Sequence, residues 1–233
     1  MFSSNKRKRA RRIEDYSYLV AKEQPLSIQT ENLQKAILNI EFSNVDRNYK
    51  VIQVTSTVAS EGKTTVLANL AYLLKQQGKK VLVLDLDLRK PKVHHLTKVP
   101  NENGITDYLL GNVDLEQVII KHELFDHIVA GQRITTINNA LNSEKLVDLL
   151  TNLKEKYDYI FVDTPPTSVV ADPLYTATIV DAVIYIVGQK IAKKKLVKQG
   201  IKEIQKGTTP IVGIILSQME LGKKEYHHYY YYE

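Results

Sequence analysis

The sequence contains no cysteine among its 233 residues. This absence excludes disulfide bonds, thiolate metal sites and a cysteine nucleophile. Long apolar runs are also missing, since no stretch approaches the roughly 18 to 20 apolar residues that span a bilayer. The basic start of the chain is not followed by an apolar segment, as it would be in a secretion signal. We therefore expect a cytoplasmic protein, for which any association with a membrane would have to come through a partner.

An excess of charge is absent outside the first dozen residues. The net charge is +6, and positions 6–12 alone supply six positive charges, from Lys6, Arg7, Lys8, Arg9, Arg11 and Arg12. This run is either a solvated tail or a contact for anionic lipid headgroups or nucleic-acid phosphates. Because the remainder of the chain is neutral, nucleic acid is not expected as a partner of the whole protein.

Apolar, β-branched runs alternate with stretches of helical period through the middle of the sequence. Strands are predicted at 50–55, 80–85, 127–130, 159–163, 183–188 and 211–216, and helices at 27–42, 63–77, 115–121, 143–156, 173–180 and 193–206. This alternation is typical of an α/β fold with a doubly wound, mainly parallel sheet flanked by helices. We expect a basic, flexible N-terminal segment at 1–26, one domain at 27–217 and a flexible tyrosine-rich tail at 218–233.

A phosphate-binding loop is predicted after the first strand, where a short loop leads into Gly62, Lys63 and Thr64 at the start of a helix. In such a loop, backbone N–H groups and the positive helix end face phosphate, a lysine reaches the outer phosphates and a hydroxyl ligates Mg²⁺. The nucleotide-binding candidates are Ser60, Glu61, Gly62, Lys63, Thr64 and Thr65. The loop departs from the standard pattern at Thr57, which replaces the first glycine.

Acidic residues follow two further predicted strands. Asp85 and Asp87 come at the end of VLVLDLD, and Asp163 ends YDYIFVD. Because an unpaired carboxylate is costly at a buried strand end, three acids there indicate a functional role. They can supply the acidic shell of a hydrated Mg²⁺, for which the candidate ligands are Thr64, Asp85 and Asp163. The sequence therefore predicts a P-loop NTPase fold that binds ATP and Mg²⁺.

These three motifs resemble the Walker A, Walker A′ and Walker B signatures of the bacterial tyrosine kinases, which are relatives of the deviant P-loop ATPases. The likeness continues through GITDYLLGN (104–112), IVAG (128–131), DAVIYIV (181–187) and VGIILS (212–217) to the end, EYHHYYYYE. The resemblance implies an ATP-dependent protein-tyrosine kinase that autophosphorylates its C-terminal tyrosines in trans and regulates capsule or exopolysaccharide synthesis and chain length. In Gram-positive bacteria such kinases are separate cytoplasmic subunits.

The resemblance also implies roles for individual residues. The catalytic set would be Lys63, Asp85, Asp87 and Asp163, with Asp85 as the base for the acceptor hydroxyl and Asp87 as the competing choice. The acceptors would be Tyr226, Tyr229, Tyr230, Tyr231 and Tyr232. The implied partners are a membrane adaptor of polysaccharide chain-length control, which activates the kinase, and a cognate phosphotyrosine phosphatase.

The chain departs from this family's pattern at several positions. Ser60 stands in place of a glycine, and a positive φ angle there would strain the loop by about 1 to 2 kcal/mol and weaken ATP binding. Of the family's glutamate and arginine oligomer motif, Glu31 remains as a candidate oligomer contact, while Gln34 and Ile37 replace arginines. A homo-oligomer stays open, but these losses argue against a stable ring. Ser217 replaces an asparagine expected near the adenine.

Two other functions fit the sequence less well. A positioning or partition-type ATPase would share the fold, but the tyrosine-rich end and the lack of an extra lysine early in the loop argue against it. A nucleotide-binding regulatory pseudokinase is favoured by Ser60 and by the altered oligomer motif. Phosphotyrosine formed by the purified chain alone would exclude both alternatives.

Overall fold

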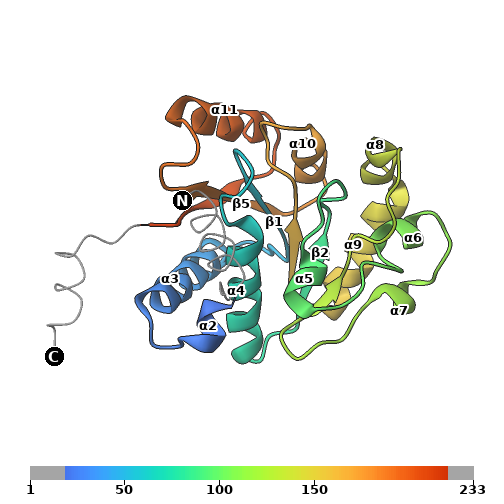
Figure 1. The fold of residues 1–233 in the computed structure, drawn as a ribbon, viewed down its shortest axis with the longest axis horizontal. Coiled ribbons are helices and arrows are strands. Elements are labelled where there is room, and N and C mark those ends of the chain that lie inside the picture. Colours follow the sequence, from blue (N-terminus) through green and yellow to red (C-terminus); the bar gives the residue numbers. More distant parts are fainter. Residues whose placement is uncertain (1–18, 220–233) are drawn as a thin grey trace, which may run out of the picture.

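The computed structural model describes residues 19–219. Six strands form one parallel sheet in the order β3-β2-β4-β1-β5-β6 (Figure 1). Their bounds are β1 Val51–Ser56, β2 Val81–Asp85, β3 Asp126–Ile128, β4 Tyr159–Asp163, β5 Ala182–Gly188 and β6 Ile211–Ser217. The prediction of a doubly wound parallel sheet is confirmed, and every predicted strand lies within two residues of its observed bounds.

The helices of the described part are α2 Val20–Glu23, α3 Ile28–Ser43, α4 Lys63–Gln76, α5 Val93–Thr97, α6 Ile105–Leu109, α7 Leu115–Val118, α8 Ile137–Leu141, α9 Glu144–Lys156, α10 Asp172–Ala177 and α11 Lys194–Ile204. The prediction for 115–121 was too long, because α7 ends at Val118 and Ile120 pairs with His127 of β3. Within residues 19–219, none of the helices combines the length and the apolar composition that crossing a bilayer requires.

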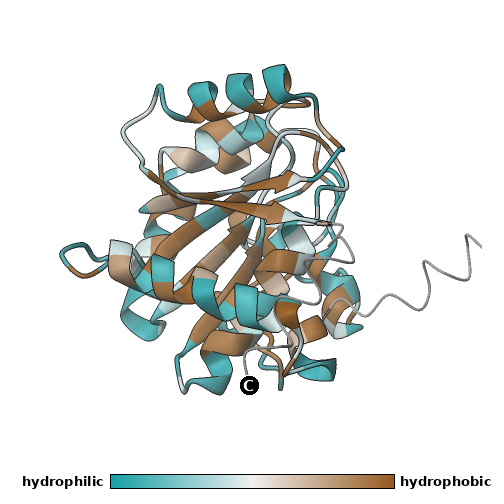
Figure 2. Cartoon of the chain, turned by 90° about the vertical axis from the view of Figure 1, so that its left-hand side faces the viewer, coloured by the Kyte–Doolittle hydropathy of each residue, from teal (hydrophilic) through white to brown (hydrophobic). Residues whose placement is uncertain are grey.

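Both faces of the sheet are covered, as a buried parallel sheet requires. Residues of β1, β2 and β4 are buried along their whole length. One face packs against α3 and α4, and the other packs against α9, α10 and α11 (Figure 1). Figure 2 shows the resulting pattern, with apolar strands between helices whose outer sides are hydrophilic.

The N-terminal boundary differs from the expectation in its last part. Residues 19–26, assigned to a flexible segment, contain α2, which packs against α4. The backbone N–H of Ala21 donates to Asn69 Oδ1 at 2.9 Å, and Ala21 is buried. The packed domain therefore begins by residue 19 instead of residue 27. The basic run at 6–12 and the tyrosines at 226–232 lie outside the described residues.

Candidate active site

The predicted phosphate loop connects β1, in the middle of the sheet, to the start of α4. Gly62 caps the helix with φ +83°, a left-handed conformation that favours glycine. Lys63 and Thr64 form the first turn of α4 and are both largely buried. The positive end of a 14-residue helix thus meets the loop, as phosphate binding requires.

Glu61 holds this loop in place from within. Its fully buried carboxylate accepts the backbone N–H of Val58 at 2.7 Å and the backbone N–H of Gly188 at 3.1 Å. The first bond closes the loop on itself, and the second ties it to the end of β5. Glu61, expected among the nucleotide-binding residues, is therefore a clamp of the loop's own backbone.

The end of β6 supplies a second restraint on the loop. Ser217 Oγ donates to the backbone carbonyl of Glu61, and Gln218 Nε2 donates to the carbonyl of Ser60 at 2.7 Å. Ser217 stands where the resemblance implies an asparagine near the adenine, and its hydroxyl lies against the loop. Gln218 was missed, because nothing in the sequence near a strand end indicates a contact 158 residues away.

Ser60 adopts φ +66°. The strain that we expected if this residue had a positive φ angle is therefore present. A side chain in the left-handed region costs about 1 to 2 kcal/mol. The restraints from Glu61 and Gln218 hold the loop in this conformation. The strain at Ser60 therefore lowers the stability of the folded loop.

Thr57, which replaces the first glycine of the standard loop, has a partner of its own. Its hydroxyl lies 3.1 Å from the hydroxyl of Tyr185 on β5, which also lies 2.9 Å from Thr167 Oγ1. All three side chains are buried, so this hydroxyl chain satisfies polar groups that would otherwise be unpaired.

Asp163, at the end of β4, lies directly beside the helix start. Its Oδ2 accepts the hydroxyl of Thr64 at 2.7 Å, while its buried Oδ1 has no hydrogen-bond partner among the described residues. Burial raises the pKa of Asp163 to about 6, and the nearby Lys63 ammonium acts in the opposite direction. An orphaned carboxylate oxygen beside a threonine hydroxyl fits a hydrated Mg²⁺.

Asp85 and Asp87 have different surroundings. Asp85 is paired with Asp163 across the adjacent strands and is fully buried. Its Oδ1 accepts the N–H of Asp87 at 3.1 Å, and its Oδ2 accepts the N–H groups of Lys92 and Val93, both at 3.0 Å. Burial and the Asp163 carboxylate raise the pKa of Asp85 to about 8, against the opposing effect of the amides.

Asp87 retains more freedom than Asp85. Its Oδ1 accepts the backbone N–H of Lys90 at 3.0 Å, and its side chain keeps a small exposed area. Burial raises the pKa of Asp87, while the Lys63 and Lys92 ammonium groups act in the opposite direction. The three predicted acids and Lys63 therefore lie together, but Asp85 has both oxygens engaged by backbone amides.

No group of three or more His, Cys, Asp or Glu side chains in the described part of the chain is arranged to hold a metal ion alone. Thr64 and Asp163 form a pair that suits Mg²⁺ only if phosphate and water complete the shell. This is the usual arrangement for Mg²⁺, which keeps several waters and binds with nucleotide phosphates.

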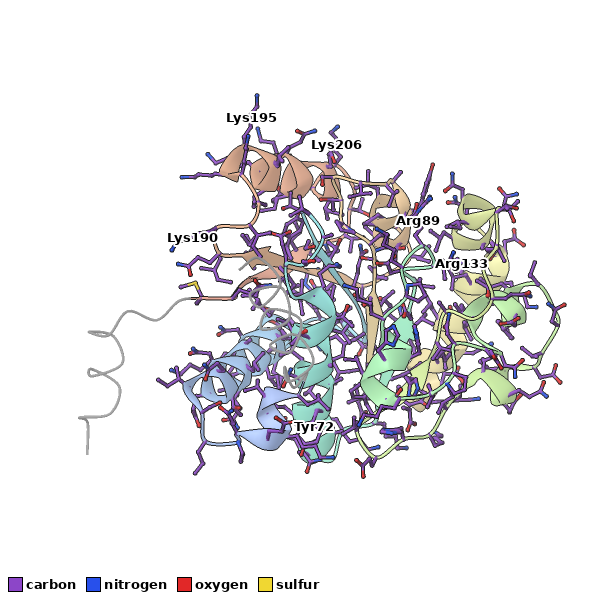
Figure 3. All side chains as sticks on the ribbon, viewed as in Figure 1. Tyr72, Arg89, Arg133, Lys190, Lys195 and Lys206 are labelled. Atoms are coloured by element: carbon purple, nitrogen blue, oxygen red, sulfur yellow. The ribbon has the colours of Figure 1, made fainter. Side chains whose placement is uncertain are left out.

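A cavity of about 730 Å³ opens beside these residues. It is lined by Ser60, Gly62, Lys63, Thr64, Thr65, Arg89, Lys90, Pro91, Lys92, His94, His95, Leu96, Asn101, Arg133 and Gln218. This lining includes five Lys and Arg side chains and no acid, so the cavity suits a polyanion such as a nucleotide triphosphate. Figure 3 labels Arg89 and Arg133, which line it from two different segments.

The sequence does not indicate a role for Arg89, since its partner lies 83 residues away along the chain. Its guanidinium forms a two-bond pair with the buried carboxylate of Asp172, at 2.8 and 3.1 Å. This pair connects the segment after β2 to α10 and fixes the cavity wall.

The candidate oligomer contact Glu31 lies on α3, together with Ile37, which stands at an arginine position of the family's oligomer motif. Glu31 is exposed in the first turn of the helix, and it does not line the cavity. Ile37 is only 1% exposed, because it packs into the core against the sheet. One of the two positions at which the resemblance implies an arginine is therefore a core position in this chain.

The parallel sheet, the loop at the start of α4 and the acids at the ends of β2 and β4 define a P-loop nucleotide-binding protein. The family model described as an AAA domain matches residues 49–214. The chain is 31% identical over 207 residues to the tyrosine-protein kinase YwqD of Bacillus subtilis, covering 88% of this chain and 87% of that protein.

Two further comparisons give the same family. The putative tyrosine-protein kinase CapB of Staphylococcus aureus is 28% identical over 209 residues, covering 89% of this chain and 92% of that protein. The kinase domain of the Escherichia coli tyrosine kinase ETK is similar in structure, with a TM-score of 0.84 and 27% identity over 88% of this chain and 81% of that chain. The chain belongs to the bacterial tyrosine kinases, and the resemblance inferred from its motifs is confirmed.

Proposed function

We propose that this chain is an ATP-dependent protein-tyrosine kinase whose acceptors are Tyr226, Tyr229, Tyr230, Tyr231 and Tyr232. The observation that carries the proposal is the buried Asp163, whose Oδ1 is orphaned beside Thr64 at the start of α4. The family relationship supports the choice of tyrosine as acceptor. The reaction is the attack of a tyrosine oxygen on the γ-phosphorus, with cleavage of the bond to ADP and transfer of the hydroxyl proton to a carboxylate.

Each residue of the site has a part in this reaction. The amides of the loop and the ammonium group of Lys63 would bind the phosphates. Thr64 and Asp163 would hold Mg²⁺, which neutralises charge on the phosphate oxygens when bound. The cavity's remaining cations, including Arg89 and Arg133, would draw the triphosphate in and orient it.

The base for the tyrosine proton is assigned to Asp87, and Asp85 is assigned a positioning role. Asp85 is fully buried and has both oxygens engaged by the amides of Asp87, Lys92 and Val93. Asp87 accepts the backbone N–H of Lys90, and the backbone N–H of Arg89 also acts on its carboxylate, but unlike Asp85 it keeps some exposure. This reverses the order of preference drawn from the sequence, in which Asp85 was the first choice.

Two variants distinguish these roles. Asp87→Asn is expected to keep the thermal midpoint and ATP binding while reducing phosphotyrosine formation by about 100-fold, the usual scale for a lost general base. Asp85→Asn is expected to lower the thermal midpoint in addition to the activity, because an amide group cannot accept all three N–H bonds that the carboxylate accepts. A fully active Asp87→Asn protein would return the assignment to Asp85.

The partners follow from the family and stay proposals. We infer a membrane adaptor of polysaccharide chain-length control as activator, a cognate phosphotyrosine phosphatase, and recruitment to the inner face of the membrane. A homo-oligomer that presents one chain's tyrosines to another chain is compatible with an end of 15 residues after Gln218, which spans at most about 50 Å. The loss of arginine at Ile37 argues against a stable ring.

The acceptor assignment has a direct experiment. Replacing all five tyrosines by phenylalanine is expected to leave ATP binding unchanged and to remove most phosphotyrosine formed with Mg-ATP. Most of the label remaining on this variant would contradict the assignment. A regulatory pseudokinase, which the strained Ser60 favours, would bind ATP and form no phosphotyrosine in either protein.

A further inference from the structure

Helix α11 carries a dense group of positive charges away from the phosphate loop. The segment 190–206 contains seven exposed lysines: Lys190, Lys193, Lys194, Lys195, Lys198, Lys202 and Lys206. The only acid in this segment is Glu203, which is half-buried. Figure 3 shows Lys195 and Lys206 pointing outward from the edge of the domain, with Lys190 nearby on the loop before the helix. We call these seven side chains the α11 lysine face.

The orientation of this face is fixed by packing on the opposite side of the helix. Gly200 and Ile204 are buried, and Val197 and Ile201 pack against the core. A Cβ atom on Gly200 would lie 2.2 Å from the hydroxyl of Tyr185, so the helix lies directly on β5. The helix cannot roll to bury its lysines without losing this contact.

Helical geometry turns the lysines into a row. At 100° per residue, Lys195, Lys198 and Lys202 lie on the side opposite the buried stripe, at i, i+3 and i+7. The row from Lys195 to Lys202 is about 10 Å long, at 1.5 Å rise per residue. Like charges placed this closely repel one another, so the row is stabilised by contact with a surface of opposite charge.

Two apolar side chains of the same segment are also exposed. Leu196 is 38% exposed and Ile191 is 36% exposed. A basic amphipathic helix with exposed apolar side chains is typical of a helix that lies in the interface of a membrane. An aliphatic side chain is stabilised when it is buried at the acyl boundary of a bilayer. The phosphodiester backbone of a nucleic acid offers no apolar surface for it to contact.

We propose that the α11 lysine face docks on a bilayer surface that contains anionic lipid headgroups, with Leu196 and Ile191 entering the headgroup boundary. This surface lies on a described helix and is distant in sequence from the basic run at 6–12, which lies outside the described residues. The inference does not depend on catalysis, because it concerns a helix that contributes no residue to the cavity beside the phosphate loop.

The experiment measures binding of the full chain to vesicles of phosphatidylcholine, with and without phosphatidylglycerol. The test variant replaces Lys195, Lys198 and Lys202 by glutamine. The matched control replaces three other exposed lysines, Lys79, Lys98 and Lys156, by glutamine, which makes the same change in net charge. Both sets are also made in a chain whose six cations at 6–12 are replaced by glutamine, so that this run cannot mask the effect.

We expect binding only to the anionic vesicles. A lysine near an anionic surface contributes roughly a factor of five, so the test variant should bind about 100-fold more weakly and the control less than about fivefold more weakly. Leu196→Ser should weaken vesicle binding several-fold. Vesicle binding that the two triple variants weaken equally, or that the chain lacks altogether, would overturn the proposal. So would duplex DNA binding that exceeds vesicle binding at physiological salt and is lost in the test variant.

Discussion

Replacing Ser60 by glycine tests whether the altered phosphate loop is strained. The substitution removes the side chain at φ +66°, where a Cβ atom costs about 1 to 2 kcal/mol. Glycine loses more backbone freedom on folding than serine does, which destabilises the variant by about 0.5 to 1 kcal/mol. Taken at the middle of both ranges, the net gain in the free energy of unfolding is about 0.75 kcal/mol. For a chain of this size, such a gain raises the thermal midpoint by about 1 to 4 °C.

The gain in stability is not expected to appear as tighter binding of Mg-ATP. The loop conformation is held by the Glu61 carboxylate and by the Gln218 bond to the Ser60 carbonyl, both parts of the folded domain. Relief of strain therefore stabilises the fold, and the dissociation constant for Mg-ATP should change by less than about threefold. From the sequence we expected serine at this position to weaken ATP binding. The structure leads us to expect instead that it lowers the stability of the fold.

Two controls accompany the measurement by differential scanning calorimetry. Ser60→Ala keeps the Cβ atom and should leave the midpoint nearly unchanged, because the Ser60 hydroxyl makes no hydrogen bond within the described residues. Lys98→Gly relieves a second positive φ angle, +55° after α5, and should stabilise by a similar amount without touching the loop. A neutral or destabilising Ser60→Gly beside a stabilising Lys98→Gly would refute the claim of strain.

Two further predictions concern packing and pH. Gly200→Ala should lower the free energy of unfolding by about 1 to 3 kcal/mol in urea, because its Cβ would meet Tyr185, whereas Gly213→Ala, with nothing within 4 Å, should be nearly neutral; equal effects would contradict the packing described. Burial lowers the pKa of His127 to about 4, so the unfolded chain takes up a proton at a higher pH than the folded chain does. The free energy of unfolding should therefore decrease as the pH falls from 6.5 towards 4. The loss should reach about 2 to 3 kcal/mol, because the groups around the ring, Thr97, His122, Phe125 and Asp126, form no carboxylate hydrogen bond that would stabilise the protonated ring. It should be absent in His127→Gln, which has no group to protonate at this position. An unchanged pH dependence in that variant would assign the titration to other groups.

The sequence predicted the sheet well because its signals are local. The strand at 159–163 was placed without error, since a short apolar run that ends in an acid has few other readings. The short helices α2, α5, α6 and α8 were missed, because four or five residues are too few to show a helical period. Their positions are set by packing, as in the bond from Ala21 to Asn69.

The site was predictable in its members but not in their partners. Lys63, Thr64 and Asp163 come together as their strand and helix ends required. The roles of Glu61 and Ser217 as clamps could not be read from the sequence, because both depend on which strands lie beside β1. Asp85 and Asp87 look equivalent two residues apart, and only the folded turn shows that three amides engage the first.

The central claim is phosphoryl transfer to tyrosine at this P-loop site, and intact-mass and phosphoamino-acid measurements on the purified chain test it most directly. The chain is incubated with Mg-ATP, with and without a candidate adaptor segment, beside Lys63→Met. The account predicts added phosphoryl groups on tyrosine in the wild type and none in Lys63→Met. ADP formation without phosphotyrosine, even with the adaptor segment, would contradict it.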